Sequence, residues 1–209
     1  MRPKLLLATN NKAKVSEYKS LLQNLPFELV TLAEEGISTV VDEVGESMEE
    51  NARLKATVLA AESQLMAMAD DSGLEVDALG GEPGTLSHRY AGEGASDEDR
   101  IQFLLSRLSD VPWENRSACF RCVIAVATPA GEVGFCYGKC SGIITFEPRG
   151  DQGFGYDPVF YLPEFNKTMA ELPLEIKNQV SHRGKAARGV HRVLEGLMGK
   201  GKSDTSVLA

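Results

Sequence analysis

Two acidic residues directly follow a short apolar run in this sequence. The run Met66 to Ala69 leads into Asp70-Asp71-Ser72-Gly73. If the run is a buried strand, both carboxylates lie at its carboxyl end, where Mg2+ can bind one or two carboxylates together with phosphate oxygens. The same four residues also suit a plain turn, in which an Asp side chain caps the backbone and Gly73 adopts a positive φ. The acidic pair alone leaves both interpretations open.

A second polar segment, Thr9-Asn10-Asn11-Lys12-Ala13-Lys14, lies between a predicted strand and a predicted helix. The free amides at the start of the helix, together with the Asn side chains and two lysines, could hold a triphosphate. Asn residues at such a position often serve only as helix caps, and this alternative remains open.

Two later segments carry residue types that suit a ligand. The loop 150–158 combines three glycines with two aromatic residues and Asp157. Such a loop lets the backbone approach a ligand while an aromatic ring covers a base. Ser181-His182-Arg183, with Lys177 one turn earlier, places cations at the start of a predicted helix, where they oppose the helix dipole. A bound anion would explain them, and a solvated turn between two helices is the alternative.

Two further motifs match known patterns without the structure that those patterns need. Residues 196–203 satisfy the P-loop pattern G-x-x-x-x-G-K-[ST], but they follow a predicted helix and leave little room for the helix that a P-loop requires. We interpret them as a basic tail. Cys119, Cys122, Cys136 and Cys140 have the spacing of a zinc ribbon. They lie in β-rich runs, where residues three apart point to opposite faces, so we favour buried thiols.

Apolar periodicity predicts the elements that position these residues. The expected strands are 4–8, 27–31, 66–69, 74–79, 117–128 and 132–146, the last two joined by a hairpin at Pro129-Ala130-Gly131. The expected helices begin after residue 11, at Ser47, at Ser96, near 173–180 and near 183–198. This mixture of strands and helices indicates an α/β architecture.

Length, composition and charge exclude several classes of protein. The chain has 209 residues, of which 43% are hydrophobic, and a formal net charge of -8. We expect a single two-lobed domain over 1–198 and a flexible tail over 199–209. No apolar run approaches the ~20 residues of a membrane span, and the first apolar stretch is too short for a signal peptide. We therefore expect a cytoplasmic protein with reduced cysteines and no membrane partner, and the acidic balance disfavours a nucleic-acid partner.

Taken in order, these motifs resemble the inosine triphosphate pyrophosphatase (Ham1-like) family of non-canonical purine nucleoside triphosphate pyrophosphatases. The resemblance extends over almost the whole chain. The matching blocks are Leu7–Lys14, Glu50-Asn51-Ala52, Ala69–Leu74, Leu79–Gly84, Arg89–Gly92, Glu147–Gly150, Gly153–Phe160 and Ser181–Ala186. Ala13, Leu86 and His88 depart from the family pattern.

The resemblance implies an α/β fold with a long mixed central β-sheet flanked by helices, and two lobes with a cleft between them. It also implies a homodimer. The implied activity is Mg2+-dependent hydrolysis of ITP, dITP or XTP to the nucleoside monophosphate and pyrophosphate, which removes deaminated purines from the nucleotide pool. One alternative is a hydrolase of the same architecture that acts on another nucleotide, such as a modified pyrimidine. The other is a zinc-ribbon nucleic-acid-binding module, which the cysteine positions and the acidic charge disfavour.

The resemblance also implies roles for individual residues. Asp71 is the expected general base and a Mg2+ ligand, and a further metal carboxylate is expected from Glu43 or its neighbour Asp42. The residues expected to hold phosphates are Thr9, Asn10, Asn11, Lys12, Ala13, Lys14, Lys55 and Ser72. The residues expected to form the base and ribose pocket are Phe154, Gly155, Tyr156, Asp157, Lys177, His182 and Arg183. A site that donates hydrogen bonds to a 6-keto oxygen would reject adenine, whose amino group leaves those donors unpaired.

Overall fold

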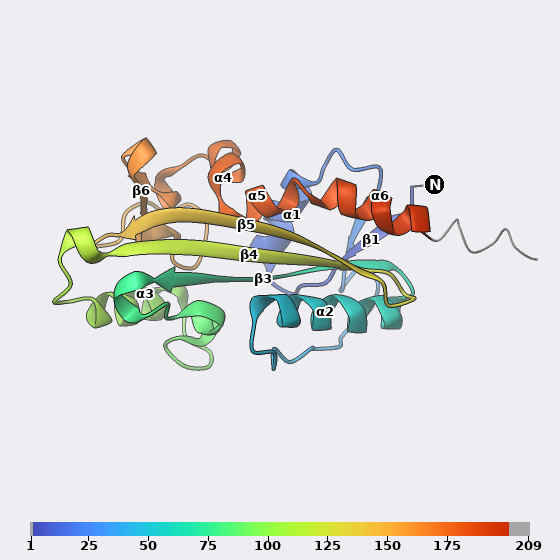
Figure 1. Cartoon of the computed structure of the whole chain (residues 1–209), viewed down its shortest axis with the longest axis horizontal. Helices are drawn as coiled ribbons and strands as arrows, with labels where there is room; N and C mark the ends of the chain where they lie inside the picture. Colours follow the sequence, from blue (N-terminus) through green and yellow to red (C-terminus); the bar gives the residue numbers. More distant parts are fainter. Residues whose placement is uncertain (1, 201–209) are drawn as a thin grey trace, which may run out of the picture. The chain divides into compact units, whose positions relative to one another are not determined.

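A computed structural model describes residues 2–200 of the chain, which fold around a mixed β-sheet (Figure 1). Within these residues the sheet has seven strands, in the order β2-β1-β3-β4-β5-β6-β7. Strand β1 pairs in parallel with β2 and β3, whereas β6 pairs antiparallel with β5 and β7. The prediction of an α/β fold with a mixed central sheet is therefore confirmed.

Most elements lie within a few residues of their predicted ranges. The strands are β1 (Lys4–Leu7), β2 (Glu28–Thr31), β3 (Met66–Val76), β4 (Ser117–Ala127), β5 (Val133–Ile144), β6 (Phe160–Leu162) and β7 (Lys167–Thr168). The α-helices are α1 (Lys12–Leu21), α2 (Met48–Ser63), α3 (Asp97–Arg107), α4 (Leu174–Val180), α5 (His182–Ala187) and α6 (Val190–Lys200). Two short 3-10 helices, η2 (Gly84–Arg89) and η4 (Asp157–Val159), lie next to residues of the site described below.

Side-chain caps explain where two of the helices begin. At the start of α2, Ser47 Oγ accepts a hydrogen bond from Glu50 N at 3.2 Å. At the start of α3, Ser96 and Asp99 form a reciprocal capping box. Both helix starts were predicted from these residue types, and both are confirmed. At α2 the Glu50 carboxylate accepts from Glu46 N, at 2.7 Å, rather than from Ser47 N.

Strand β3 differs from the prediction of two strands on either side of a turn at Asp70–Gly73. It runs without a break through these residues. Asp70 and Asp71 are buried within it, and their carboxylates contact Lys14 Nζ and Asn51 Nδ2 from other elements. Because these partners compensate for the buried charges, the acidic pair can stay inside a strand. The turn interpretation is wrong, and the pair lies within the strand rather than at its end.

The helix predicted over 183–198 is in fact two helices, α5 and α6, which are separated at Arg188-Gly189. A Cβ atom on Gly189 would lie 2.9 Å from Cys136 Sγ of β5, so this close approach needs a glycine. Glycine is also a poor helix former, which favours the break. The P-loop-like segment 196–203 is helical up to Lys200. Its remainder, like the predicted tail from 201 onward, lies outside the described residues.

The chain divides into two compact units. The first unit comprises Met1–Asp71, Val123–Tyr137 and Ala186–Ala209, and the second comprises Ser72–Cys122 and Gly138–Lys185. Strands β3, β4 and β5 contribute residues to both units. The predicted cleft between two lobes stays a prediction.

In the first unit, helices cover both faces of the sheet. Ala52, Ala56 and Leu59 of α2 are almost fully buried, in one apolar cluster with strand residues such as Leu6 and Ala67. Helix α6 lies on the opposite side of the strands from α2 (Figure 1). Small residues on α2 therefore let this helix lie close to the sheet that carries the acidic pair.

In the second unit, a buried arginine joins the end of β5 to the segment that follows α3. Arg116 is 1% exposed. Its guanidinium donates hydrogen bonds of 2.8 to 3.2 Å to the carbonyl oxygens of Leu108, Val111, Ile144 and Thr145. The charge is therefore stabilised by carbonyl dipoles, beside the main apolar cluster of this unit.

The cysteines lie in β4 and β5, in the hairpin that the sequence predicted, and Cys122, Cys136 and Cys140 are buried. Burial raises the pKa of the Cys136 and Cys140 thiols to about 11. Both thiols are then protonated at neutral pH and are poor metal ligands. The positions favour buried thiols over a zinc ribbon.

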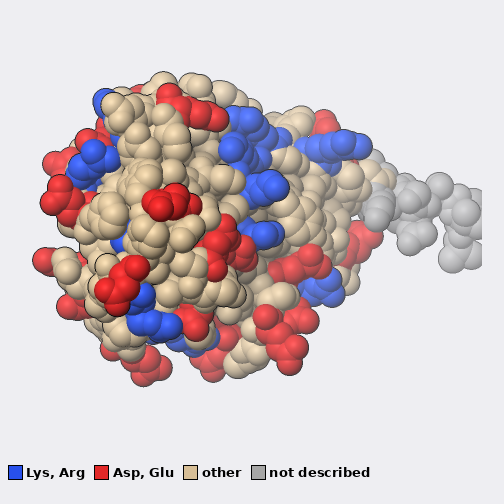
Figure 2. Space-filling view, turned by 60° about the vertical axis from the view of Figure 1, so that its left-hand side comes forward, with Lys and Arg blue, Asp and Glu red and all other residues tan. Residues whose placement is uncertain are grey.

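Charged side chains of both signs are mixed on one face of the molecule. Figure 2 shows Lys and Arg interspersed with Asp and Glu on the face in view. The net charge of -8 therefore describes an average of interspersed charges. In residues 2–200, no helix is both long enough and apolar enough to cross a membrane.

Candidate active site

The first part of the site is a lysine–carboxylate cluster in the first unit, formed by Lys14, Lys55, Glu43, Asp70 and Asp71. Lys14 Nζ lies 3.0 Å from Asp70 Oδ1. Lys14 belongs to the first turn of α1, which begins at its cap, Asn11. Asn11 Oδ1 accepts from the backbone N of Ala13 at 2.9 Å and of Lys14 at 3.1 Å. This cap holds Lys14 beside the acidic pair.

Lys55 of α2 lies at the centre of the cluster. Its Nζ donates to Glu43 Oε1 at 2.7 Å and to the backbone oxygen of Asp70 at 2.6 Å. Burial opposes the charge on Lys55, but the negative charges of Asp70, Asp71 and Glu43 together raise its pKa above the ordinary value. Lys55 is therefore a fixed positive charge among carboxylates, suited to neutralise a phosphate.

Asp71 is an acid of the cluster whose pKa is shifted by its surroundings. Burial raises its pKa above the ordinary value, and the charge of Glu43 raises it further. The charges of Lys55 and Lys14 and the hydrogen bond from Asn51 act in the opposite direction and only partly offset this rise. An acid with a raised pKa is a better proton acceptor from water than an exposed Asp.

Asn51 is a site residue to which the sequence analysis assigned no role. It is 2% exposed; its Nδ2 donates to Asp71 Oδ2 at 3.0 Å, and its Oδ1 accepts from Gly45 N at 2.8 Å. The two bonds fix which side of the amide faces Asp71, and they tie the segment that carries Glu43 to β3. A Cβ on Gly45 would lie 2.7 Å from Asn51 Oδ1, so glycine is needed there. In the sequence, Asn51 stands out only as a polar residue next to the apolar Ala52, inside the block Glu50-Asn51-Ala52 that carries the family resemblance.

The cluster fits a divalent cation that binds together with phosphate. Among residues 2–200, no three His, Cys, Asp or Glu side chains are placed to hold a metal by themselves. Glu43 and Asp71 nevertheless both act on Lys55, and Mg2+ typically takes one or two carboxylates, waters and substrate phosphate oxygens. Of the two acids predicted as alternatives, Glu43 contacts Lys55, whereas the side chain of Asp42 is exposed.

The second part of the site is an aromatic–cation cluster in the second unit, formed by Ser72, Phe154, Asp157, Lys177 and Arg183. Lys177 Nζ lies 2.6 Å from Asp157 Oδ2, and both side chains are buried. Lys177 Nζ lies 5.1 Å, and Arg183 Cζ 5.2 Å, from the centre of the Phe154 ring. Arg183 Nη2 donates to Ser72 Oγ at 3.0 Å. The cluster offers an aromatic face together with cationic donors.

His182 and Arg183, at the start of α5, are 5% and 2% exposed, so the alternative of a solvated turn is wrong. Ser181 Oγ accepts from Gly184 N at 3.0 Å and caps this turn. The His182 ring stacks on Phe120 of β4, with ring centres 4.6 Å apart. Phe120 was not among the predicted site residues, because its position in an apolar strand does not distinguish it from other core residues.

Glycines permit the tight path of the loop that carries Phe154. Gly153 has a φ of +81°, and a Cβ there would collide with Asp157 Oδ2 and lie 2.8 Å from Lys177 Nζ. Asp157 Oδ2 also accepts from Phe154 N at 2.9 Å. Asp157 therefore fixes the aromatic residue and the lysine at the same time.

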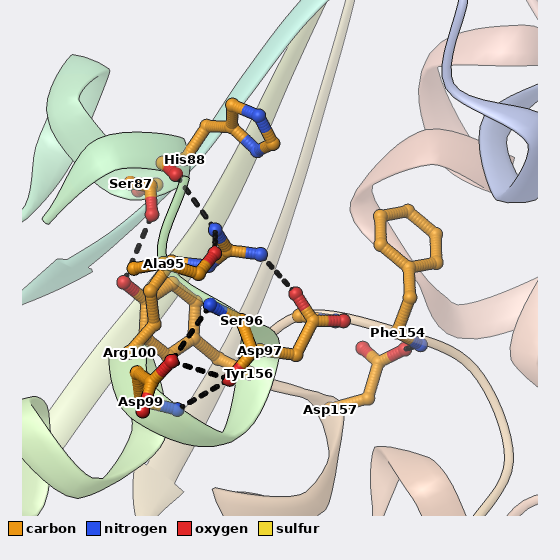
Figure 3. A network of polar contacts seen from close by, with 11 residues as sticks. Ser87, His88, Ala95, Ser96, Asp97, Asp99, Arg100, Phe154, Tyr156 and Asp157 are labelled. Carbon is orange, nitrogen blue, oxygen red and sulfur yellow. Dashed lines mark hydrogen bonds and ion pairs between the residues drawn. The ribbon is translucent and has the colours of Figure 1, made fainter. Parts of the chain in front are cut away.

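The predicted residues thus differ in their surroundings. Tyr156 is 4% exposed and belongs to the apolar core, and its hydroxyl donates to the backbone oxygen of Ser87 at 2.9 Å (Figure 3). It anchors the loop, and Phe154 is the aromatic side chain beside the cations. In the first unit, Thr9 Oγ1 accepts from Asn11 N, while Asn10 and Lys12 are exposed.

One cluster has lysines beside carboxylates, and the other has an aromatic ring beside cations. These groups define an α/β protein whose side chains are suited to bind the phosphates and the base of a nucleotide. Residues 5–193 match the model of the Ham1 family. The chain belongs to the Ham1 family.

Individual relatives agree with this membership. A dITP/XTP pyrophosphatase of Geobacter sulfurreducens is 51% identical, over 88% of this chain and 92% of its own length. A dITP/XTP pyrophosphatase of Bacillus subtilis is 44% identical, over 91% of this chain and 96% of its own length. Among solved structures, a Ham1 protein from Coxiella burnetii has a TM-score of 0.84 and 40% identity, and covers 93% of this chain and 99% of its own.

Proposed function

We propose that this chain hydrolyses dITP, XTP and ITP to the nucleoside monophosphate and pyrophosphate, with Mg2+ as the metal ion. The observation that carries the proposal is Lys55, whose Nζ lies 2.7 Å from Glu43 Oε1 and whose pKa is raised by Asp70, Asp71 and Glu43. Such a mixture of cations and acids suits a metal-bound polyphosphate. The names of the Geobacter and Bacillus relatives support the choice of substrate.

In the proposed reaction, a water molecule attacks the α-phosphorus. The bond between the α-phosphorus and the oxygen that bridges to the β-phosphate breaks, and pyrophosphate leaves. Asp71 accepts the proton of the attacking water, a role that its raised pKa supports. Lys14 and Lys55 balance the negative charge of the phosphates. When bound by Glu43 and Asp71, Mg2+ would add charge neutralisation and lower the pKa of water.

The aromatic–cation cluster is proposed to bind the base. Phe154 offers a ring for stacking, and His182 and Arg183 offer hydrogen-bond donors. The 6-keto oxygen of hypoxanthine or xanthine accepts hydrogen bonds, whereas the 6-amino group of adenine donates them. A buried donor that faced adenine would lose its partner, which typically costs about 1–3 kcal/mol. We therefore propose discrimination against ATP.

The test is the incubation of the purified protein with Mg2+ and ITP, dITP, XTP, GTP, ATP or a modified pyrimidine triphosphate. Monophosphate and pyrophosphate should form from the deaminated purines, and a chelator should stop the reaction. Asp71→Asn should abolish turnover without changing the circular dichroism spectrum. Equal turnover of ATP, or preference for the pyrimidine, would contradict the proposed specificity. A homodimer is also proposed, by family resemblance, and light scattering in solution measures it.

A further inference from the structure

We propose that Asp97, in the first turn of α3, is a positioning residue for the base-binding loop. The geometry that points to it is a pair of contacts. Asp97 Oδ2 accepts from Gly155 N at 2.7 Å. Asp97 Oδ1 forms an ion pair with Arg100 Nη2, which Figure 3 shows. Gly155 follows Phe154 directly. The inference rests on the proposed function, because it assigns to Asp97 the role of holding Phe154 where a base would stack.

Asp97 is itself held in place by the start of its helix. Ser96 Oγ accepts from Asp99 N at 3.1 Å, and Asp99 Oδ2 accepts from Ser96 N at 2.9 Å. These two residues already complete the cap of α3. The helix therefore does not need the Asp97 carboxylate as its cap, and this group is available for the loop.

Arg100 extends the connection from Asp97 to η2. Its side chain is only 10% exposed, and its Nη1 donates to the backbone oxygens of His88 at 2.9 Å and Ala95 at 2.6 Å. A guanidinium held by two carbonyl groups has a fixed orientation. Asp97 thus binds a rigid partner on one side and the loop on the other.

The loop has a second tie to the same 3-10 helix. Tyr156 donates to the backbone oxygen of Ser87, the residue before His88. Ser87 is fixed in turn, because its Oγ accepts from Leu74 N at 2.9 Å and donates to Gly84 O at 2.6 Å. Gly155 thus lies between two residues with different roles: Phe154 is proposed to stack on the base, and Tyr156 is anchored in the core. Asp97 fixes the peptide between them.

Loss of the Asp97 contact should free the peptide at Gly155. This glycine has a φ of +61°, and a Cβ atom there would meet no atom within 4 Å, so neighbouring atoms restrict the peptide little. A loop that must become ordered on binding lowers the affinity for the part of the ligand that it contacts. The affinity for a nucleotide should therefore fall, while that for a ligand without a base should not.

The test compares two ligands by isothermal titration calorimetry with Mg2+: inosine monophosphate, which carries the base, and inorganic pyrophosphate, which lacks it. Asp97→Ala should weaken inosine monophosphate binding about tenfold, the size expected for one hydrogen bond to a charged group, and leave pyrophosphate binding within twofold. In turnover of ITP, the same variant should raise KM and leave kcat nearly unchanged.

Asp97→Asn keeps an acceptor for Gly155 N and should lose less affinity for inosine monophosphate than Asp97→Ala does. Glu98→Ala, at the next and exposed position, is the matched control and should bind both ligands as the wild type does.

Wild-type affinity of Asp97→Ala for inosine monophosphate would overturn the inference, and so would an equal loss for both ligands, which indicates a general structural defect. Both results leave the proposed function intact. If the wild-type protein binds pyrophosphate but not inosine monophosphate, the proposed base site is wrong and the inference falls with it. The wild-type titration therefore separates the two failures.

Discussion

At the scale of single residues, the site depends on buried or partly buried polar side chains that each form two polar contacts. Asn51 joins Gly45 to Asp71, Asp157 joins Phe154 to Lys177, and Lys55 joins Glu43 to the backbone of Asp70. Each of these side chains fixes a neighbouring group, so its loss should lower activity even where it does not touch the substrate.

Asn51→Ala should lower kcat about tenfold to a hundredfold. The substitution removes the hydrogen bonds that Asn51 makes with Asp71 Oδ2 and Gly45 N, and a hydrogen bond to a charged group typically contributes about 1.5–3 kcal/mol. Steady-state kinetics with ITP and saturating Mg2+ measure the change. Glu62→Gln, at an exposed position of the same helix, is the control. An Asn51→Ala enzyme with wild-type kcat would show that Asp71 needs no such support.

Asp71 should titrate above the ordinary Asp pKa of about 3.9 in the metal-free protein, because burial raises its pKa. Since the folded-state pKa is raised, the carboxyl is still protonated in a pH range where an exposed Asp has lost its proton, and it ionises as the pH rises through the higher value. Carbonyl-carbon NMR over pH 3 to 8 measures this, and Asp71→Asn identifies the resonance. A midpoint at or below 3.9 would contradict the expected environment.

Glu43→Gln should reduce kcat at least tenfold and raise the Mg2+ concentration needed for half-maximal rate. Glu43 contacts Lys55, and its charge acts on Asp71, whereas Asp42 is exposed. Asp42→Asn should therefore change both quantities less than threefold. The comparison is made by varying Mg2+ at fixed ITP. The reverse order of effects would identify Asp42 as the metal carboxylate.

At the scale of elements, the accuracy of the sequence prediction depended on whether the signal was local. The starts of α2 and α3 follow from Ser47 and Ser96, whose capping partners lie three residues away, so both were predicted correctly. Strand β3 was divided wrongly because Asp70-Asp71 has the composition of a turn, and the residues that stabilise it there, Lys14 and Asn51, are distant in sequence.

The same reasoning applies to the remaining differences. The break at Gly189 depends on contact with Cys136, and the role of Asp97 depends on contact with Gly155, 58 positions away. Family resemblance suggested the residues of both clusters, whereas the positioning roles of Asn51 and Asp97 depend on partners that are distant in sequence. Their partners became apparent only in the folded chain.

Arg116→Leu should destabilise the fold by about 3 kcal/mol. The substitution removes the hydrogen bonds that the buried guanidinium donates to the backbone oxygens of Leu108, Ile144 and Thr145. Urea unfolding, monitored by circular dichroism, measures the loss. Arg121→Leu, in strand β4, which begins just after Arg116, removes a half-exposed ion pair with Glu75 and should cost less than about 1 kcal/mol. Similar losses in the two variants would contradict the role assigned to Arg116.

At the scale of the whole molecule, the net charge of -8 hides a local arrangement. Acidic and basic side chains are interspersed on the face in view in Figure 2. Around Lys55, the carboxylates of Asp70, Asp71 and Glu43 form a pattern that suits a metal ion with a polyphosphate. The chain divides into two compact units, of which the first contains the lysine–carboxylate cluster and the second the aromatic–cation cluster. Asp71 ends the first unit and Ser72 begins the second.

In the proposed reaction, water attacks the α-phosphorus and pyrophosphate leaves intact. Hydrolysis of dITP with Mg2+ in water enriched in oxygen-18, followed by mass spectrometry of the products, tests this step. We predict one labelled oxygen in the nucleoside monophosphate and none in the pyrophosphate. Label in pyrophosphate, or release of orthophosphate as the first product, would contradict the proposed reaction.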